Sequence, residues 1–393
     1  MTRTRAISTA ERRARIGVRH ALTPGARVAS PSAAADAVVA LHSTDAATVF
    51  LSACVRLERP EVSAVEKALY DDPPQLVKLL AMRRTLFAVS RATAPYVDAA
   101  AARAIAERER KNLLRQLADW NGKDAAWLAK AEDAALAVLA EKGEATGQEI
   151  AAADPLLRTR IVVFPGSRQE TELGVVSRVL RVLAADGRIR RGHPRGTWTS
   201  SQFRWAPGEV FPALRPAEAQ AEVARRWLVA YGPGTEADFK WWTGWTLTAA
   251  RKALAAAGAR EVTLQDGGPA YVAADDQPVP AADVSRETPW AALLPALDPT
   301  PMGWQDRSWF LPSGDQGLYD RSGNIGPTVW WNGQIIGGWA QRPDGEVVWR
   351  LFGSYGKEAA AAVESAAARL ASVIGEARVT PRFRTPLERE LSA

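Results

Sequence analysis

One stretch of this chain restricts its fold more than any other, because residues 132–199 contain three helical segments followed by two short strand segments. The first helix is predicted over 132–142, and a turn at Gly143 leads into a short helix capped by Thr146. The third helix is predicted over 175–185, and the Asp186-Gly187 turn opens a hairpin that pairs 188–191 with 196–199. This order is that of the winged helix-turn-helix, a module that places its third helix and its hairpin against DNA.

Arginine is concentrated in the parts of this predicted module that would meet DNA. The chain has 41 arginines against 9 lysines, and its formal net charge is +6. Part of the excess is explained by the Ala-, Arg- and Gly-rich composition typical of a high-GC genome. The clustering is more informative, because arginine binds phosphate in a bidentate manner. Both the third helix and the hairpin carry arginines, which favours phosphate contacts over the alternative that these side chains only face solvent. The predicted phosphate contacts are Arg178, Arg181, Arg188 and Arg191.

The same order of elements recurs. Helices are predicted over 216–231, 235–242 and 246–257, with a strand beginning at 262–264, and residues 33–91 are expected to hold a third copy. From 268 to 353 the pattern changes to short alternating runs with an Asn332-Gly333 hairpin turn, and a helix is predicted over 357–375. The predicted fold class is α+β, mostly α, with three tandem winged-helix modules and a small C-terminal antiparallel β-unit.

The predicted domains follow from these patterns. They are residues 1–130, an N-terminal helical and first winged-helix module; 131–210, the second module; 211–267, the third; and 268–393, the β-unit with its helix. In the first domain, Ser32 or Asp36 is expected to cap a helix that runs through Leu41, and Thr44 or Asp45 to start the next. Residues 41–45 therefore fall at a junction between two helices, where backbone donors are exposed.

Composition excludes several classes of protein. The single cysteine, Cys54, rules out a disulfide framework and cysteine-based metal sites, and no apolar run approaches the length of a membrane span. The basic N-terminus lacks the apolar segment of a signal peptide. We expect a cytoplasmic monomer with no metal, no cofactor and no membrane partner.

Several segments together resemble the AlkZ/YcaQ-like winged-helix DNA glycosylases. The resemblance extends from about residue 12 to 370, and the segments that carry it are Met-Arg-Arg-Thr-Leu at 82–86, Gly-Pro-Gly-Thr at 232–235 with the residues up to 244, Leu-Asp-Pro at 297–299, Trp304, Arg307 and 332–339. It implies modules that grip duplex DNA and an activity that hydrolyses the N-glycosidic bond of bulky or cationic alkylated purines such as N7-alkylguanine. Some relatives protect their producers from DNA-alkylating antibiotics.

The resemblance also points to a catalytic motif, Gln-x-Gln or Gln-x-Asp, that aligns with Leu-His-Ser-Thr-Asp at residues 41–45. Here His42 and Thr44 replace the two motif residues, a departure similar to the variant linked to trioxacarcin-type antibiotic clusters. Neutral His42 is expected to accept a proton from the attacking water, and Thr44 to orient that water. Asp45 either stabilises the sugar cation or caps the next helix.

Other candidates keep two interpretations each. Arg83 and Thr85 contact phosphate or belong to a helix-end ion pair, and Asp298 faces the DNA cleft or serves an Asp-Pro turn. The leading function is a monofunctional glycosylase, because no lysine near residues 41–45 could form a Schiff base with the sugar. The alternative is a winged-helix DNA-binding protein without catalysis, either a regulator or a lesion-binding factor.

Overall fold

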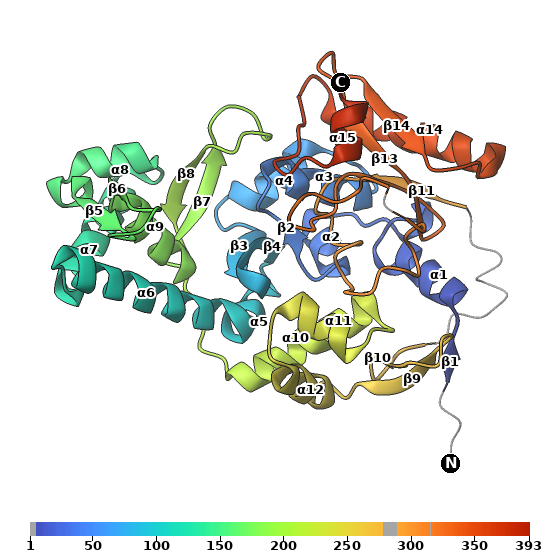
Figure 1. Ribbon diagram of the computed structural model, residues 1–393, viewed down its shortest axis with the longest axis horizontal. Coiled ribbons are helices and arrows are strands. Elements are labelled where there is room, and N and C mark those ends of the chain that lie inside the picture. The colour runs from blue at the N-terminus through green and yellow to red at the C-terminus, as the bar shows by residue number, and fades with distance from the viewer. Residues whose placement is uncertain (1–4, 278–288, 315) are drawn as a thin grey trace.

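The computed structural model describes residues 5–277, 289–314 and 316–393, and its N-terminal part contains a small sheet that carries the candidate motif (Figure 1). Residues 31–90 form three helices and an antiparallel sheet with strand order β2-β4-β3. These elements are α2 (Pro31–Ala37), β2 (Leu41–His42), α3 (Ala46–Arg56), α4 (Val62–Tyr70), β3 (Leu76–Ala81) and β4 (Thr85–Ser90). They follow α1 (Thr9–Arg19).

Helix α2 is shorter than predicted. Ser30, and not Ser32 or Asp36, caps it by accepting a hydrogen bond from the Ala33 N–H, and the helix ends at Ala37. Val39 then adopts a left-handed backbone with φ 64°, and Leu41 pairs with Ala88 as part of β2. The predicted helix through Leu41 is therefore wrong, because hydrogen bonding to the distant strand β4 overrides the local helical pattern.

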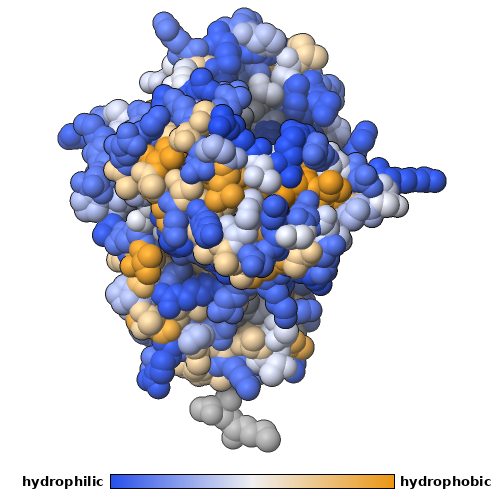
Figure 2. Space-filling view, turned by 90° about the vertical axis from the view of Figure 1, so that its left-hand side faces the viewer, coloured by the Kyte–Doolittle hydropathy of each residue, from blue (hydrophilic) through white to orange (hydrophobic). Residues whose placement is uncertain are grey.

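Residues 103–207 form a separate lobe with its own apolar core (Figure 1). Its elements are α6 (Arg103–Asn121), α7 (Ala125–Lys142), α8 (Gly147–Ala153), β5 (Arg160–Val163), β6 (Thr171–Gly174), α9 (Val176–Ala185), β7 (Ile189–Pro194) and β8 (Phe203–Pro207). The helix–helix–helix–hairpin order of 132–199 is present, with an unpredicted hairpin β5–β6 inserted before α9. The surface on this side of the molecule is mostly hydrophilic, with apolar side chains in separate patches (Figure 2).

The second strand of the predicted wing is misplaced. Strand β7 pairs with Phe203–Pro207 and not with residues 196–199, which lie in the connecting loop. Trp198 from that loop packs against Phe50 of α3, with ring centroids 5.4 Å apart. The loop is therefore longer than a tight hairpin turn because its tip is anchored on another part of the chain.

A third helical segment follows α5 (Ala94–Val97) and the lobe. It contains α10 (Pro216–Tyr231), α11 (Glu236–Thr243), α12 (Leu247–Ala256), β9 (Arg260–Leu264) and β10 (Pro269–Val272). A reciprocal capping box between Thr235 and Asp238 starts α11, as this sequence pattern favours. The N-terminal strand β1 (Ala6–Ile7) pairs in parallel with β9, so the start of the chain completes this sheet.

The C-terminal part is the predicted antiparallel β-unit with a long helix. Its sheet has the order β11-β12-β13-β14, formed by β11 (Ala291–Leu294), β12 (Thr328–Trp331), β13 (Gln334–Gln341) and β14 (Val347–Leu351). Asn332 and Gly333 both have positive φ, as the predicted two-residue turn requires. Helix α14 (Gly356–Ile374) covers this sheet, and α15 (Pro386–Leu391) packs against β13.

The largest core joins most of the segments outside the lobe, and two smaller clusters lie between the C-terminal sheet and α14 and in the β1-β9-β10 sheet. Buried side chains from residues 16–101, 211–335 and Leu387 form a single cluster, whereas residues 113–189 form the core of the lobe. The predicted mixture of helices with small sheets is confirmed, and three segments share the helix–helix–helix–hairpin order. The number of winged-helix modules and the domain limits remain predictions.

Candidate active site

The β2–β4 pairing brings four of the predicted site residues together. His42 lies opposite Phe87, and the Ser43 N–H donates to the Leu86 carbonyl at 2.9 Å, which continues the pairing by one residue. This register places Thr44 beside Thr85, and the β3–β4 turn that carries Arg83 follows directly. The long-range pairing of the strands thus assembles a site from residues 42–44 and 83–85.

His42 is a buried, neutral imidazole. Its side chain contacts the edge of Phe87, and its Nδ1 accepts a hydrogen bond from the Thr44 N–H at 3.4 Å. Burial and the nearby Arg83 charge lower the pKa of His42 to about 3. With Nδ1 acting as the acceptor, the proton of the neutral ring is on Nε2, which has no hydrogen-bond partner among the described residues. His42 is therefore arranged to donate from Nε2 and is too weakly basic to hold a proton near pH 7.

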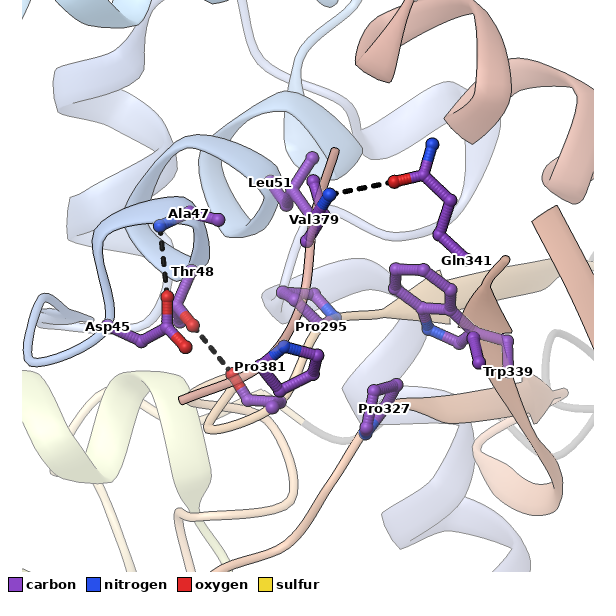
Figure 3. Close-up of a pocket in the computed structure, with 12 residues that line it drawn as sticks. Asp45, Ala47, Thr48, Leu51, Pro295, Pro327, Trp339, Gln341, Val379 and Pro381 are labelled. Carbon is purple, nitrogen blue, oxygen red and sulfur yellow. Dashed lines mark hydrogen bonds between the residues drawn. The ribbon is translucent and has the colours of Figure 1, made fainter. Parts of the chain in front are cut away.

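Asp45 serves the fold of the motif. One carboxylate oxygen caps α3 by accepting from the Ala47 N–H at 3.1 Å, and the other accepts from the Arg382 N–H at 2.7 Å. Figure 3 shows Asp45 at one end of a cavity that is also lined by Trp339 and Pro381. The free volume of this cavity is about 10 Å³, at the limit for one water molecule. Of the two interpretations of Asp45, the geometry supports the helix cap.

The two buried histidines make acid sensitivity an expected property. His20 is fully buried, and its pKa is also lowered to about 3, by burial and by Arg56. Below pH 6.5 the unfolded chain binds protons that the folded protein excludes, so the free energy of unfolding falls as the pH decreases toward 3. The expected loss is about 1.4 kcal/mol per pH unit for each histidine, or about 5 kcal/mol for both at pH 4.5. Urea unfolding of wild type, His20→Gln and His42→Gln between pH 7 and 4.5 measures this loss of free energy. The prediction is contradicted if the free energy of unfolding falls as steeply with decreasing pH in the variants as in the wild type.

The predicted arginines of α9 and the hairpin occupy different environments. Arg178 and Arg181 lie on α9, where Arg181 is exposed and 3.8 Å from Glu109. Arg188 forms an ion pair within the lobe, because its guanidinium lies 3.2 Å from a carboxylate oxygen of Glu132. Arg191 stacks over Phe203 at 4.5 Å. The sequence predicted their clustering; in the structure Arg188 and Arg181 each have an acidic partner, at 3.2 and 3.8 Å, whereas no ion pair within the described residues involves Arg178 or Arg191.

One further basic residue at this surface, Lys78, escaped sequence analysis. Lys78 and Arg190 line a cavity of about 260 Å³ between β3 and the hairpin, together with Arg181 and Arg191, and no carboxylate lines it. Burial, Arg191 and Arg190 lower the pKa of Lys78 to about 7. No local pattern could have identified this pairing, because it arises from the contact between the lobe and the N-terminal sheet.

Asp298 is not a DNA-facing residue. Its side chain is completely buried, and its two oxygens accept from both terminal nitrogens of Arg56, at 2.7 and 2.9 Å. Burial raises the pKa of Asp298, but Arg56 outweighs that effect and holds the pKa below its usual value. The prediction of a DNA contact is corrected, because a carboxylate without exposed surface and with a buried counter-ion cannot reach the DNA.

The described residues contain no group of three or more histidine, cysteine, aspartate and glutamate side chains placed to hold a metal ion. Among the same residues, no helix combines the length and apolarity needed to span a membrane.

Comparison with known proteins completes the description. The family described as DNA glycosylase AlkZ-like matches residues 35–373. Among solved structures, a DNA glycosylase AlkZ from Streptomyces sahachiroi aligns with a TM-score of 0.68 and 21% sequence identity, covering 95% of this chain and 98% of that chain. This structural similarity shows a common fold. No curated protein sequence matches the chain.

Proposed function

This chain belongs to the AlkZ-like DNA glycosylase family, and from that premise we propose that it is a monofunctional DNA glycosylase for bulky or cationic alkylated purines, with N7-alkylguanine as the reference substrate. The observation that carries the proposal is the convergence of His42 and Thr44 with Arg83 and Thr85 at the β2–β4 pairing. Duplex DNA carrying such a purine is the proposed partner.

The proposed reaction needs little acid or base catalysis. N7 alkylation gives the purine a positive charge, so the base leaves with the electron pair of the C1′–N9 bond and becomes neutral. Water then forms the new bond to C1′ and releases a proton to solvent. The protein has to hold that water and stabilise a sugar with oxocarbenium character.

His42 and Thr44 divide this task. The Nε2–H of His42 donates to the oxygen of the attacking water and fixes its position, and the Thr44 hydroxyl, half-buried beside it, both accepts and donates. A histidine with a pKa of about 3 stays neutral throughout the physiological range, so it adds no positive charge next to the developing cation. We therefore replace the role of His42 as a general base with that of a neutral hydrogen-bond donor.

The sheet register supports a monofunctional enzyme. Lys78 on β3 is in register with Ala88 and, across it, with Leu41. Because side chains alternate between the two faces of a sheet, Lys78 lies on the face opposite to His42. This lysine is thus turned away from the proposed reaction centre, where a Schiff base with the sugar would form.

The basic residues on β3, α9 and β7, of which Arg181 is exposed and the others are partly buried, support binding of the DNA backbone. Arg178, Arg181 and Arg191 on α9 and β7, with Lys78 and Arg190 beside them, form a basic surface on the lobe side of the N-terminal sheet. Arg83 and Thr85 belong to the β3–β4 turn next to the motif. We propose that these residues contact phosphates. The same activity would serve general repair or self-resistance to a DNA-alkylating antibiotic.

A single assay tests the proposal. A labelled duplex with one N7-methylguanine, and a second with a bulky N7 adduct, are incubated with the protein and then with or without alkali. Strand breaks only after alkali, with no protein–DNA adduct trapped by borohydride, are the expected result. An unmodified duplex is the control. Tight binding without base release from either adduct would instead favour the non-catalytic DNA-binding protein.

A further inference from the structure

Two arginines from distant parts of the chain stack on one tryptophan beside the candidate active site. The guanidinium carbon of Arg83, in the β3–β4 turn, lies 4.2 Å from the ring centroid of Trp241 on α11. That of Arg307, in the loop between β11 and β12, lies 5.0 Å from a ring centroid of the same tryptophan and 5.7 Å from that of Tyr319. All four side chains are half-buried, so the cluster is accessible at the surface.

Among the described residues, the two positive charges of this cluster have no acidic partner. Arg307 donates to the Trp304 carbonyl and to the Met302 sulfur, and Nε of Arg83 is buried without a hydrogen-bond partner in the part of the chain that the structure describes. No ion pair involves either guanidinium within the described residues. Burial and the neighbouring Arg307 lower the pKa of Arg83 to about 10, so its guanidinium remains charged near pH 7. Two like charges held together in this way favour the binding of an anion between them.

The backbone holds Arg83 in this position. Arg83 has φ 53°, a left-handed conformation that residues with bulky side chains rarely adopt. Gly244 at the end of α11 packs directly on it, since a Cβ at Gly244 would lie 3.2 Å from Cγ of Arg83. Backbone conformations of this kind are concentrated at ligand-binding sites. The contact between the turn and α11 therefore aligns Arg83 with Trp241 before any ligand arrives.

We propose that Arg83 and Arg307, aligned by Trp241, clamp one phosphate of the DNA backbone adjacent to the target nucleotide. An arginine that stacks by its face keeps its N–H groups in the plane of the guanidinium, where they match the oxygens of a phosphodiester. Nη1 of Arg307 and both terminal nitrogens of Arg83 make no hydrogen bond to another described residue, so they can donate to such a group. A positively charged purine would be repelled here, whereas a phosphate neutralises both guanidiniums. The proximity of Arg83 to His42 and Thr44 then sets the position of the target sugar. This inference rests on the proposed function, because it assigns the DNA contact nearest to the reaction.

Binding to duplexes with single neutral phosphates tests the clamp without requiring catalysis. Methylphosphonates are placed one at a time on both sides of an N7-alkylguanine, and Kd is measured for wild type, Arg307→Gln, Arg307→Lys and Arg83→Gln. At one position, the methylphosphonate is expected to raise Kd of the wild type about 10-fold, as for loss of a charged hydrogen-bonded pair. At the same position it is expected to change Kd of Arg307→Gln less than 2-fold. Arg307→Lys is expected to recover part of the affinity for the normal phosphate.

The salt dependence provides a second measurement. Arg307→Gln is expected to reduce the slope of log Kd against log salt concentration by about 0.9, the value for one phosphate. The Arg83→Gln/Arg307→Gln double variant is expected to lose no more than about that amount, because both side chains bind the same group. The matched control is Arg350→Gln, whose exposed arginine pairs with Glu390 on another part of the surface.

Two outcomes would overturn the clamp: equal methylphosphonate effects in wild type and Arg307→Gln, or a lower melting temperature of Arg307→Gln with an unchanged salt slope. Either would make the stack a structural cation–π contact. Base release by the wild type is recorded separately on the duplex with normal phosphates. The clamp can therefore fail while glycosylase activity persists, and absence of activity leaves the binding measurement informative.

Discussion

Replacement of His42 by alanine is expected to lower the rate of base release at least 100-fold while changing Kd for the lesion duplex by less than 3-fold. The reason is that Nε2–H is the donor we place at the attacking water, and loss of one such group in an active site costs about 10²–10⁴ in rate. DNA affinity depends mainly on the basic residues, which the substitution leaves in place. Single-turnover base release and fluorescence anisotropy measure the two quantities.

His42→Gln separates a hydrogen-bond donor from a general base. A glutamine amide donates a hydrogen bond but does not titrate, so this variant is expected to stay within about 10-fold of wild type. Because burial and Arg83 keep the wild-type pKa at about 3, the rate is expected to show no inflection near pH 6.5. An inflection of the rate between pH 6 and 7 that disappears in His42→Gln would show that His42 acts as a general base. Full activity of His42→Ala would show that His42 has no role in the mechanism.

The second large effect concerns stability. Asp298→Asn is expected to reduce the free energy of unfolding by about 3–5 kcal/mol, because it leaves the fully buried Arg56 without its counter-ion. Arg56 and Asp298 connect α3 to the loop before Thr300, whose hydroxyl also contacts Arg56 and His20. Loss of this pair therefore loosens the core where the N-terminal sheet meets the C-terminal part. Urea unfolding at pH 7 measures the change.

Glu390→Gln is the matched control for this substitution, since it breaks an exposed Arg–Glu pair and is expected to cost less than about 1 kcal/mol. The salt slope of DNA binding by the folded Asp298→Asn protein is expected to equal that of the wild type. A loss of stability below 1 kcal/mol would contradict the structural role. A change in the salt slope would return Asp298 to the DNA-binding surface.

The features that sequence analysis identified correctly depend on neighbouring residues. The Asn332-Gly333 turn requires positive φ at both positions, which these residues tolerate, and the Thr235–Asp238 capping box closes within four residues. The helix predicted over 357–375 lies within one residue of α14, and the helix predicted over 132–142 ends at the last residue of α7, because their composition favours helix over many turns. Asp45 was among the expected starts of α3 for the same local reason.

The errors have a common origin in contacts between distant segments. The wing strand at 196–199 looked extended, but Trp198 is held by Phe50, and β7 pairs with residues from 203 onward. Asp298 looked like a turn residue at a cleft, and its partner Arg56 lies 242 residues earlier in the chain. Phe50 and Arg56 are far from these residues in the sequence, so they leave no periodicity or spacing near Trp198 or Asp298 that sequence analysis could recognise.

For this protein, the sequence by itself determined the order of the helices and hairpins, the concentration of arginine around α9 and β7, and the motif at residues 42–45. Turns, caps and helix periodicity are encoded by residues a few positions apart, so they can be recognised without a structure. Only the tertiary structure decided which residues lie together at the proposed site: β4 and the turn before it bring Thr85 and Arg83 to His42, and α11 with the loop before β12 brings Trp241 and Arg307 to Arg83. The chemistry of His42 was decided there too, because burial and a neighbouring charge, which no single sequence reveals, lower its pKa and make it a donor.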